Sequence, residues 1–191
     1  SLAILWSNLR MLAARPGKYL ATFLTLIKAN WGSRRYLVGA IAFFPKTVYF
    51  AVAMKRLGVA HVHAHFASHP AAMAFAIHRL TGIPYSFTAH GSDLHRDQHM
   101  LKEKTAEAAF VVAISQYNHD IILNHSGHEY AQRVHIVHCG VDPEQFFPRE
   151  QATAFERGAG PFLILCIGTL HEVKGQTHLL EACRQLRERG A

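Results

Sequence analysis

The stretch that most constrains the fold is residues 61–93, which read HVHAHFASHPAAMAFAIHRLTGIPYSFTAHGSD. An apolar run ends at His65, an Ala-rich segment follows, and a second apolar run ends at His90. This order predicts a strand, a helix and a second strand parallel to the first. In parallel α/β sheets, ligands bind beyond the carboxyl ends of the strands. His65 and His90 are therefore predicted to lie in a ligand pocket.

The same alternation extends along the chain on both sides of this stretch. Strands are expected at residues 59–66, 85–89, 110–114 and 134–138, and helices at 69–80, 101–109 and 116–124. Two earlier helices, 2–14 and 19–30, are separated by Arg15-Pro16-Gly17. Residues 36–54 have the length of a membrane span, but Pro45 and Lys46 at their middle favour a buried or interfacial helix. We expect an α/β fold, a Rossmann-like parallel sheet with helices on both faces.

The pattern starts again after a Pro- and Gly-containing segment without clear periodicity. A strand at 162–167, a turn at 168–175 and a helix at 176–189 follow it. We expect an amino-terminal domain at 1–145, a linker at 146–160, and the first strand-helix unit of a second domain at 161–191. One such unit cannot bury its own apolar faces, so the chain is expected to be part of a longer protein.

Composition and charge narrow the range of partners. Half of the residues are hydrophobic and 17% are charged, which suits a packed core. Ten Lys or Arg and no Asp or Glu precede Asp93, whereas ten basic and thirteen acidic residues are found from there on. This asymmetry favours an anionic membrane surface or a lipid-linked substrate, and a basic surface with no specific partner is the alternative. Nucleic acid is disfavoured, because the basic residues are diluted among apolar ones.

The cysteines favour a reducing compartment. Cys139, Cys166 and Cys183 are odd in number, far apart and without a CxxC pair, which is typical of free thiols. We expect a cytoplasmic location and leave open a peripheral one on the inner face of the membrane.

Three histidines share one face of the first predicted strand. His61, His63 and His65 alternate along it, which is a geometry that suits a metal and would make the chain a metal-dependent hydrolase. The other interpretation is a set of pocket and core histidines held by hydrogen bonds. Because no carboxylate precedes Asp93, no metal site is predicted.

Two loops have the residues expected for binding polar groups. In Thr88–Asp93, a His-Gly pair ends a strand and suits a sharp turn, so that His90 could donate to a sugar hydroxyl or phosphate; bonding to backbone alone is the alternative. In Gly168–Gly175, helix-start amides and Lys174 favour an anion such as a diphosphate; a plain turn is the alternative. Neither GxxxxGK[ST] nor GxGxxG is present there.

Taken together, five segments resemble the retaining glycosyltransferases of family 4, which have the two-Rossmann-domain GT-B fold. They are HVHAHF (61–66), GIPYSFTAHGSD (82–93), VVAIS (111–115), VHCGVDPEQFFP (137–148) and ILCIGTLHEVKG (164–175). The resemblance implies sugar transfer from a nucleotide-diphosphate sugar, the donor substrate, to a glycan or lipid-linked acceptor with retention of configuration. It implies no metal and no other cofactor. The amino-terminal domain would hold the acceptor and the carboxyl-terminal one the donor.

The resemblance also assigns expected roles to individual residues. His90 matches the family's catalytic cleft histidine, and Lys174 matches the lysine that steadies the leaving diphosphate. The other expected donor-binding residues are Gly168, Thr169 and Gly140, and the expected acceptor or cleft residues are His65, Gly91, Asp93 and Ser115.

The chain departs from the family pattern at several points. Thr169 replaces a common arginine, Cys139 replaces a common asparagine, and the Gly-rich loop of the family's first strand is absent. The paired glutamates, two Glu separated by seven residues, are expected beyond Ala191. We therefore expect a fragment of a hexosyltransferase that is inactive alone. A non-catalytic membrane-surface module is the remaining alternative.

Overall fold

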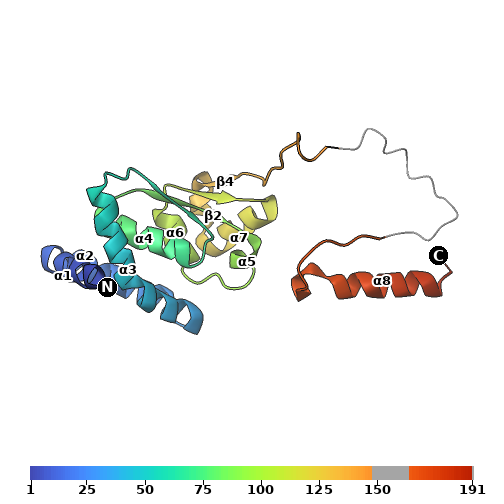
Figure 1. Cartoon of the computed structure of the whole chain (residues 1–191), viewed down its shortest axis with the longest axis horizontal. Coiled ribbons are helices and arrows are strands. Elements are labelled where there is room, and N and C mark those ends of the chain that lie inside the picture. The colour runs from blue at the N-terminus through green and yellow to red at the C-terminus, as the bar shows by residue number, and fades with distance from the viewer. Residues whose placement is uncertain (148–163, 191) are drawn as a thin grey trace. The chain divides into compact units, whose positions relative to one another are not determined.

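The computed structural model describes residues 1–147 and 164–190, which form two units, Ser1–Val141 and Asp142–Ala191 (Figure 1). The first unit begins with three helices, α1 (Leu2–Ala14), α2 (Pro16–Ala29) and α3 (Arg34–Arg56). Pro16 takes the first position of α2, where its missing N–H costs nothing, so the predicted turn at 15–17 shrinks to Arg15.

Helix α3 lies against the rest of the first unit along one side. Its start is capped by Ser33, whose hydroxyl accepts a hydrogen bond from the Tyr36 amide (3.4 Å). Among the described helices, α3 alone is long and apolar enough to cross a bilayer by length and composition. It nevertheless packs on α4 (His69–Thr81) and α1, and buries Phe44 and Val48. One side of α3 is therefore core.

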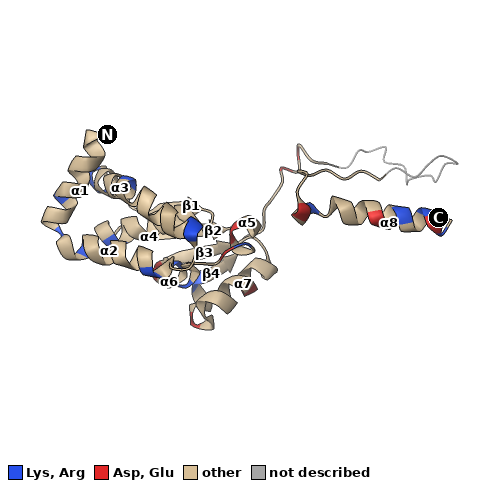
Figure 2. Cartoon of the chain, turned by 90° about the horizontal axis from the view of Figure 1, so that it is seen from below, with Lys and Arg blue, Asp and Glu red and all other residues tan. Residues whose placement is uncertain are grey.

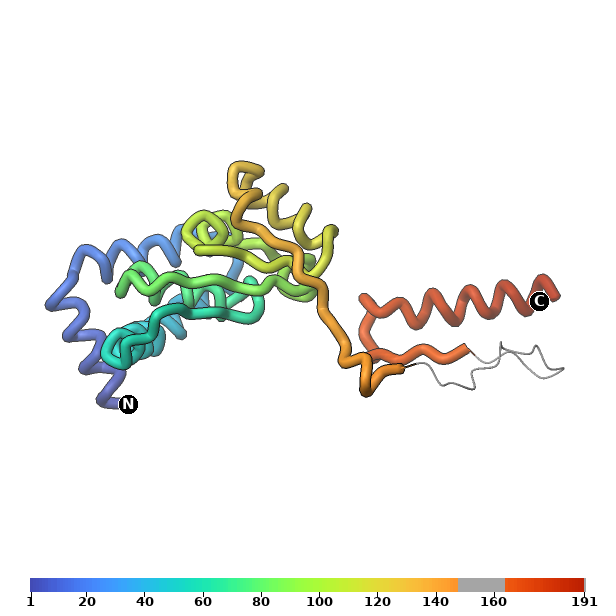
Figure 3. Tube along the Cα trace, turned by 90° about the horizontal axis from the view of Figure 1, so that it is seen from above, coloured from blue at the N-terminus to red at the C-terminus, as the bar shows by residue number. Residues whose placement is uncertain are grey.

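Four parallel strands follow in the order β1-β2-β3-β4, which confirms the predicted α/β class. They are β1 (Val62–His65), β2 (Tyr85–Ala89), β3 (Phe110–Ala113) and β4 (Val134–Ile136), traced side by side in Figure 3. The strands are connected by α4, by α5 (Gly91–Leu94) with α6 (Leu101–Glu107), and by α7 (Gln116–Ser126) with the 3-10 helix η1 (His128–Arg133). Because the strands advance in one direction and such crossovers are right-handed, the connecting helices gather on one face.

Strand register decides which side chains meet those helices. Ala64 pairs with Phe87, Phe87 with Val111 and Val111 with Val134, and all four are buried. Helix α4 packs on β1 and β2, and α7 packs on β3 and β4, while α2 and α3 form a further layer on α4. This apolar face and its helices form the core of the unit.

The opposite face of the sheet is partly open. On it, Ser86 and Thr88 of β2 are buried, whereas Phe110 and Val112 of β3 are half-buried. His63, His65 and His135 on the same face are exposed. The helical layer expected on this second face is not formed by the described residues.

The second unit contains a 3-10 turn, η2 (Glu172–Lys174), and helix α8 (Gln176–Glu188), which is the predicted helix. The predicted strand at 162–167 is wrong over its described part, Ile164–Ile167, which is irregular. A strand needs a hydrogen-bonding partner, and the described part of this unit supplies none. The rest of that strand, and most of the predicted linker at 146–160, lie outside the described residues.

Candidate functional site

The carboxyl edge of the sheet brings the two predicted pocket histidines together. His65 ends β1 and His90 follows β2, and the register that pairs His65 with Thr88 places the two strand ends side by side. Their Nδ1 and Nε2 atoms lie 3.5 Å apart and their rings are stacked with centroids 5.8 Å apart. His65 is exposed and His90 is half-buried, so both rings have a solvent-facing part that a polar ligand can reach.

Phe66, which the sequence did not single out, completes this group. Its ring centroid lies 4.8 Å from that of His90, and its backbone has a φ of +77°. A left-handed conformation is strained for a bulky residue and persists only where its surroundings enforce it. Phe66 therefore belongs to the local architecture of the His65–His90 pair.

The Asp93 carboxylate joins the loop that follows β1 to the residue that precedes α5. Asp93 is 7% exposed, and its two carboxylate oxygens accept hydrogen bonds from the backbone amides of His90 (2.9 Å) and Ala67. We predicted Asp93 as an acceptor or cleft residue. In the structure its oxygens are engaged by the backbone, so that it fixes the start of α5, where Gly91 is the first residue.

The Lys104 side chain is also hydrogen-bonded to the loop that follows β1, at Ala67. Its ammonium group donates to the carbonyl oxygens of Ala67 (2.5 Å) and His99 (3.2 Å), and its side chain is buried. Burial lowers the pKa of Lys104 from 10.5 to about 8, against the attraction of Glu103, Asp93 and Asp97. No sequence motif marked this lysine, because its burial follows from tertiary packing.

His61, which precedes β1, and His63 of β1 bind hydroxyl groups of β2. The Ser86 hydroxyl lies 2.7 Å from both His61 Nε2 and His63 Nδ1, and the Thr88 hydroxyl lies 3.0 Å from His63 Nε2. Burial, with the charges of His65 and His61, lowers the pKa of His63. Both ring nitrogens of His63 are thus engaged, and the described residues contain no cluster of three metal-type ligands. The geometry favours the hydrogen-bonded interpretation of HVHAH.

Ser115 and Gly140 follow the next two strands. Ser115 caps α7 by accepting a hydrogen bond from the Asn118 amide (3.2 Å). Gly140 is exposed and has open space where a Cβ atom would stand. Ser115 lies two residues after β3, at the same sheet edge as His90, and Gly140 lies four residues after β4.

The predicted donor loop belongs to the second unit. The Gln176 side chain donates to the Thr169 carbonyl (2.8 Å), and Gly175 has the left-handed φ of +69° that starts α8. Gly168 and Lys174 are exposed, and the Lys174 amide donates to the His171 carbonyl (2.8 Å). Lys174 lies in the second unit and His90 in the first.

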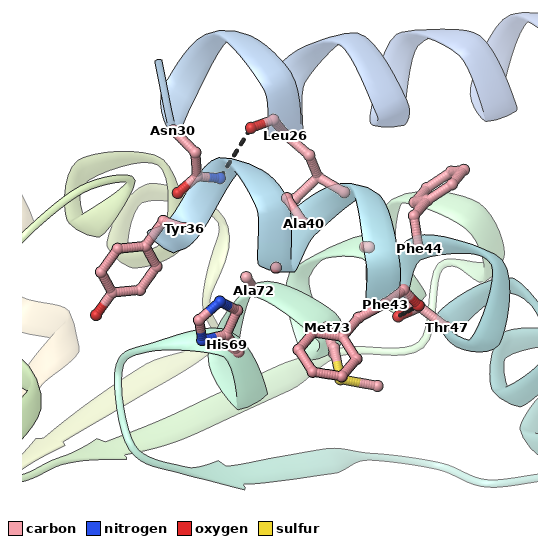
Figure 4. Close-up of a pocket in the computed structure, with 12 residues that line it drawn as sticks. Leu26, Asn30, Tyr36, Ala40, Phe43, Phe44, Thr47, His69, Ala72 and Met73 are labelled. Carbon is pink, nitrogen blue, oxygen red and sulfur yellow. Dashed lines mark hydrogen bonds between the residues drawn. The ribbon is translucent and has the colours of Figure 1, made fainter. Parts of the chain in front are cut away.

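A cavity of the first unit lies between α2, α3 and α4 and is lined by His69, the first residue of α4 (Figure 4). Its volume of about 20 Å³ suits one water molecule and excludes a sugar. The Asn30 amide nitrogen donates to Leu26 (2.8 Å), whereas Asn30 Oδ1 and His69 Nε2 are buried without a partner in the described structure. The sheet edge, not this cavity, is the candidate site.

Comparison with known proteins assigns the family. The family model described as Glycosyltransferase Family 4 matches residues 13–145. The chain belongs to glycosyltransferase family 4. No curated protein and no solved structure matched it.

The family match includes part of the predicted site of this glycosyltransferase. His65, His90, Ser115 and Gly140 fall inside residues 13–145, and the predicted donor loop with Lys174 falls outside them. The donor-side prediction therefore depends on the resemblance of residues 164–175 and on the exposed lysine.

Proposed function

We propose that this family 4 chain contributes the acceptor side of a retaining sugar-transfer site. The observation that carries the proposal is the His65–His90 pair at the carboxyl edge of β1 and β2, in a domain of a glycosyltransferase family. The donor is proposed to be a nucleotide-diphosphate sugar and the acceptor a glycan or lipid-linked sugar. No cofactor is proposed.

His90 is the proposed catalytic residue. Its backbone is fixed by Asp93 and its ring by contacts with His65 and Phe66, so the imidazole needs little rearrangement when a sugar binds. A hydrogen-bond donor that is already in position does not have to reorganise as charge develops in the transition state. We assign to His90 a hydrogen bond to the transferred sugar.

Lys174 is the proposed partner of the leaving diphosphate. It is exposed and takes part in no ion pair of the described residues, while the adjoining helix start presents backbone amides. Cationic groups stabilise the negative charge that grows on a departing diphosphate. Gly168 and Thr169 would shape the loop around it.

The cysteines support a cytoplasmic location for this activity. Cys139, Cys166 and Cys183 are free thiols, and the first two are exposed. Exposed thiols persist in reducing compartments.

The test is a transfer assay with the protein at its natural length. Purified protein is incubated with nucleotide-diphosphate glucose, mannose, galactose or N-acetylglucosamine, and with lipid-linked and soluble glycan acceptors. Nucleotide release and the anomeric configuration of the product are measured. Release with retention that depends on acceptor supports the proposal. Release with inversion, or metal-dependent hydrolysis without transfer, would overturn it. The 191-residue chain assayed alone is expected to be inactive.

A further inference from the structure

Helix α1 has an apolar surface on its outer side as well as its inner side. Ser7 is buried and Ile4 and Met11 are half-buried against the unit, as expected for one packed face. On the opposite side, the i, i+3, i+4, i+7 spacing aligns an exposed stripe formed by Leu2, Leu5, Trp6, Leu9 and Leu12. Leu2 and Trp6 are 85% and 68% exposed. An exposed stripe of this kind marks an interaction surface.

Cationic side chains adjoin this stripe. Trp6, Arg10 and Arg56 line one groove between α1 and α3. Arg10 and Arg56 also line a neighbouring groove of about 310 Å³, together with Arg15 and Lys55. The stripe and four cations thus form one surface, which we name the α1–α3 surface.

No negative charge balances these cations. The sequence has no Asp or Glu before Asp93, so α1 to α4 contain no carboxylate, as the absence of red from these helices in Figure 2 shows. None of the four cations takes part in an ion pair within the described residues. Their charge is available to an external anion.

We propose that the α1–α3 surface docks the protein on an anionic lipid bilayer. Tryptophan prefers the membrane interface, leucines enter the acyl boundary, and Arg and Lys are attracted to anionic headgroups. Helix α1 has thirteen residues, about 20 Å in length, and so lies in the interface without spanning a core about 30 Å thick. Two copies joined through this surface would bring their uncompensated cations together, which disfavours a second chain as the occupant.

Sedimentation of the 191-residue chain with vesicles tests the proposal. Binding to phosphatidylcholine vesicles is expected to be weak, and added phosphatidylglycerol is expected to strengthen it in a salt-sensitive manner. The double variant R10Q with R56Q should weaken binding to anionic vesicles by about tenfold to thirtyfold. Each Lys or Arg near an anionic surface contributes a similar electrostatic attraction, and this variant removes two of them. W6S with L9S should weaken binding to a similar extent. The control K102Q with R189Q removes the same charge from exposed positions elsewhere and should bind like the parent.

Fluorescence provides a readout of insertion that sedimentation lacks. The chain has two tryptophans, so W31F leaves Trp6 as the sole reporter. Its emission should shift to the blue on anionic vesicles and be quenched by brominated lipid. Equal binding to neutral and anionic vesicles, an unmoved emission, or a control as weak as R10Q with R56Q would overturn the proposal. A dimer that W6S with L9S dissociates, without vesicle binding, would assign the stripe to a second copy instead.

Discussion

The Lys104 ammonium group lies 2.5 Å from the carbonyl oxygen of Ala67, in the loop that follows β1. The amide of Ala67 donates to the Asp93 carboxylate, so one residue of this loop is held from both sides. The preceding residue, Phe66, has a positive φ and contacts His90. Lys104 and Asp93 thus position the loop beside the proposed catalytic histidine.

The stability of the protein should rise between pH 8 and pH 9.5 because of Lys104. Its pKa is lowered by burial to about 8, against 10.5 when unfolded, so the unfolded state binds more protons in this window. Stability then increases by up to about 1.4 kcal/mol per pH unit. Urea unfolding at pH 7.5 and 9.5 measures this change. In K104M the rise should be lost, and a rise equal to that of the parent would contradict this assignment. Above pH 10, Tyr85 acts in the opposite direction, because burial raises its pKa.

D93N should destabilise the fold by about 1–3 kcal/mol, because an amide accepts one of the two backbone hydrogen bonds and presents a donor to the other. In the parent protein the buried Asp93 carboxylate accepts both hydrogen bonds, from the backbone amides of His90 and Ala67. Chemical denaturation checks this. The control is D120N, at an exposed carboxylate of α7, which should change stability by less than about 0.5 kcal/mol. Equal effects of the two variants would remove the special role of Asp93.

Two glycine-to-alanine substitutions, G39A and G17A, test the contact of α3 with α4. A Cβ atom at Gly39 would collide with the His69 imidazole, whereas one at Gly17 would meet nothing within 4 Å. G39A should therefore lower stability by about 1–3 kcal/mol through overpacking. G17A should be neutral, or stabilise by up to about 1 kcal/mol through helix propensity. Thermal denaturation of both variants gives the comparison, and a neutral G39A would show that His69 can move aside.

H90A should lower sugar transfer by the protein at its natural length by about 10²-fold or more, because a preorganised hydrogen-bond donor is lost. H125A removes an exposed histidine of α7 and should leave transfer unchanged. Initial rates with saturating donor, together with a far-UV circular dichroism spectrum, separate loss of chemistry from loss of folding. Normal transfer by folded H90A would refute its catalytic role.

K174A should reduce transfer by a similar factor, since the leaving diphosphate would lose a cation. The effect should appear in turnover and in affinity for free nucleoside diphosphate, measured by calorimetry. K102A removes an exposed cation of α6 and serves as the control. Unchanged nucleotide affinity in K174A would place the diphosphate elsewhere.

Local sequence was sufficient for the elements that depend on nearby residues. The run Tyr85–Ala89 was predicted with its observed bounds, because a turn precedes this short apolar segment and His-Gly follows it. Helix α4 starts at the predicted His69 and ends next to Gly82, whose φ of +80° suits a helix end. The strand predicted at 162–167 failed over its described part because a strand depends on a partner that local sequence does not provide.

The sequence by itself determined the α/β class, the family and the nearness of His65 to His90, because parallel strands of known order end at the same sheet edge. Only the tertiary structure decided what each polar group does there. His63 binds Ser86 and Thr88 through cross-strand register, and Lys104 is buried by the packing of segments far apart in the chain. The outward direction of the α1 stripe was likewise decided by which face packs on α3. Register, burial and facing are relations between distant segments, so periodicity within one segment does not reveal them.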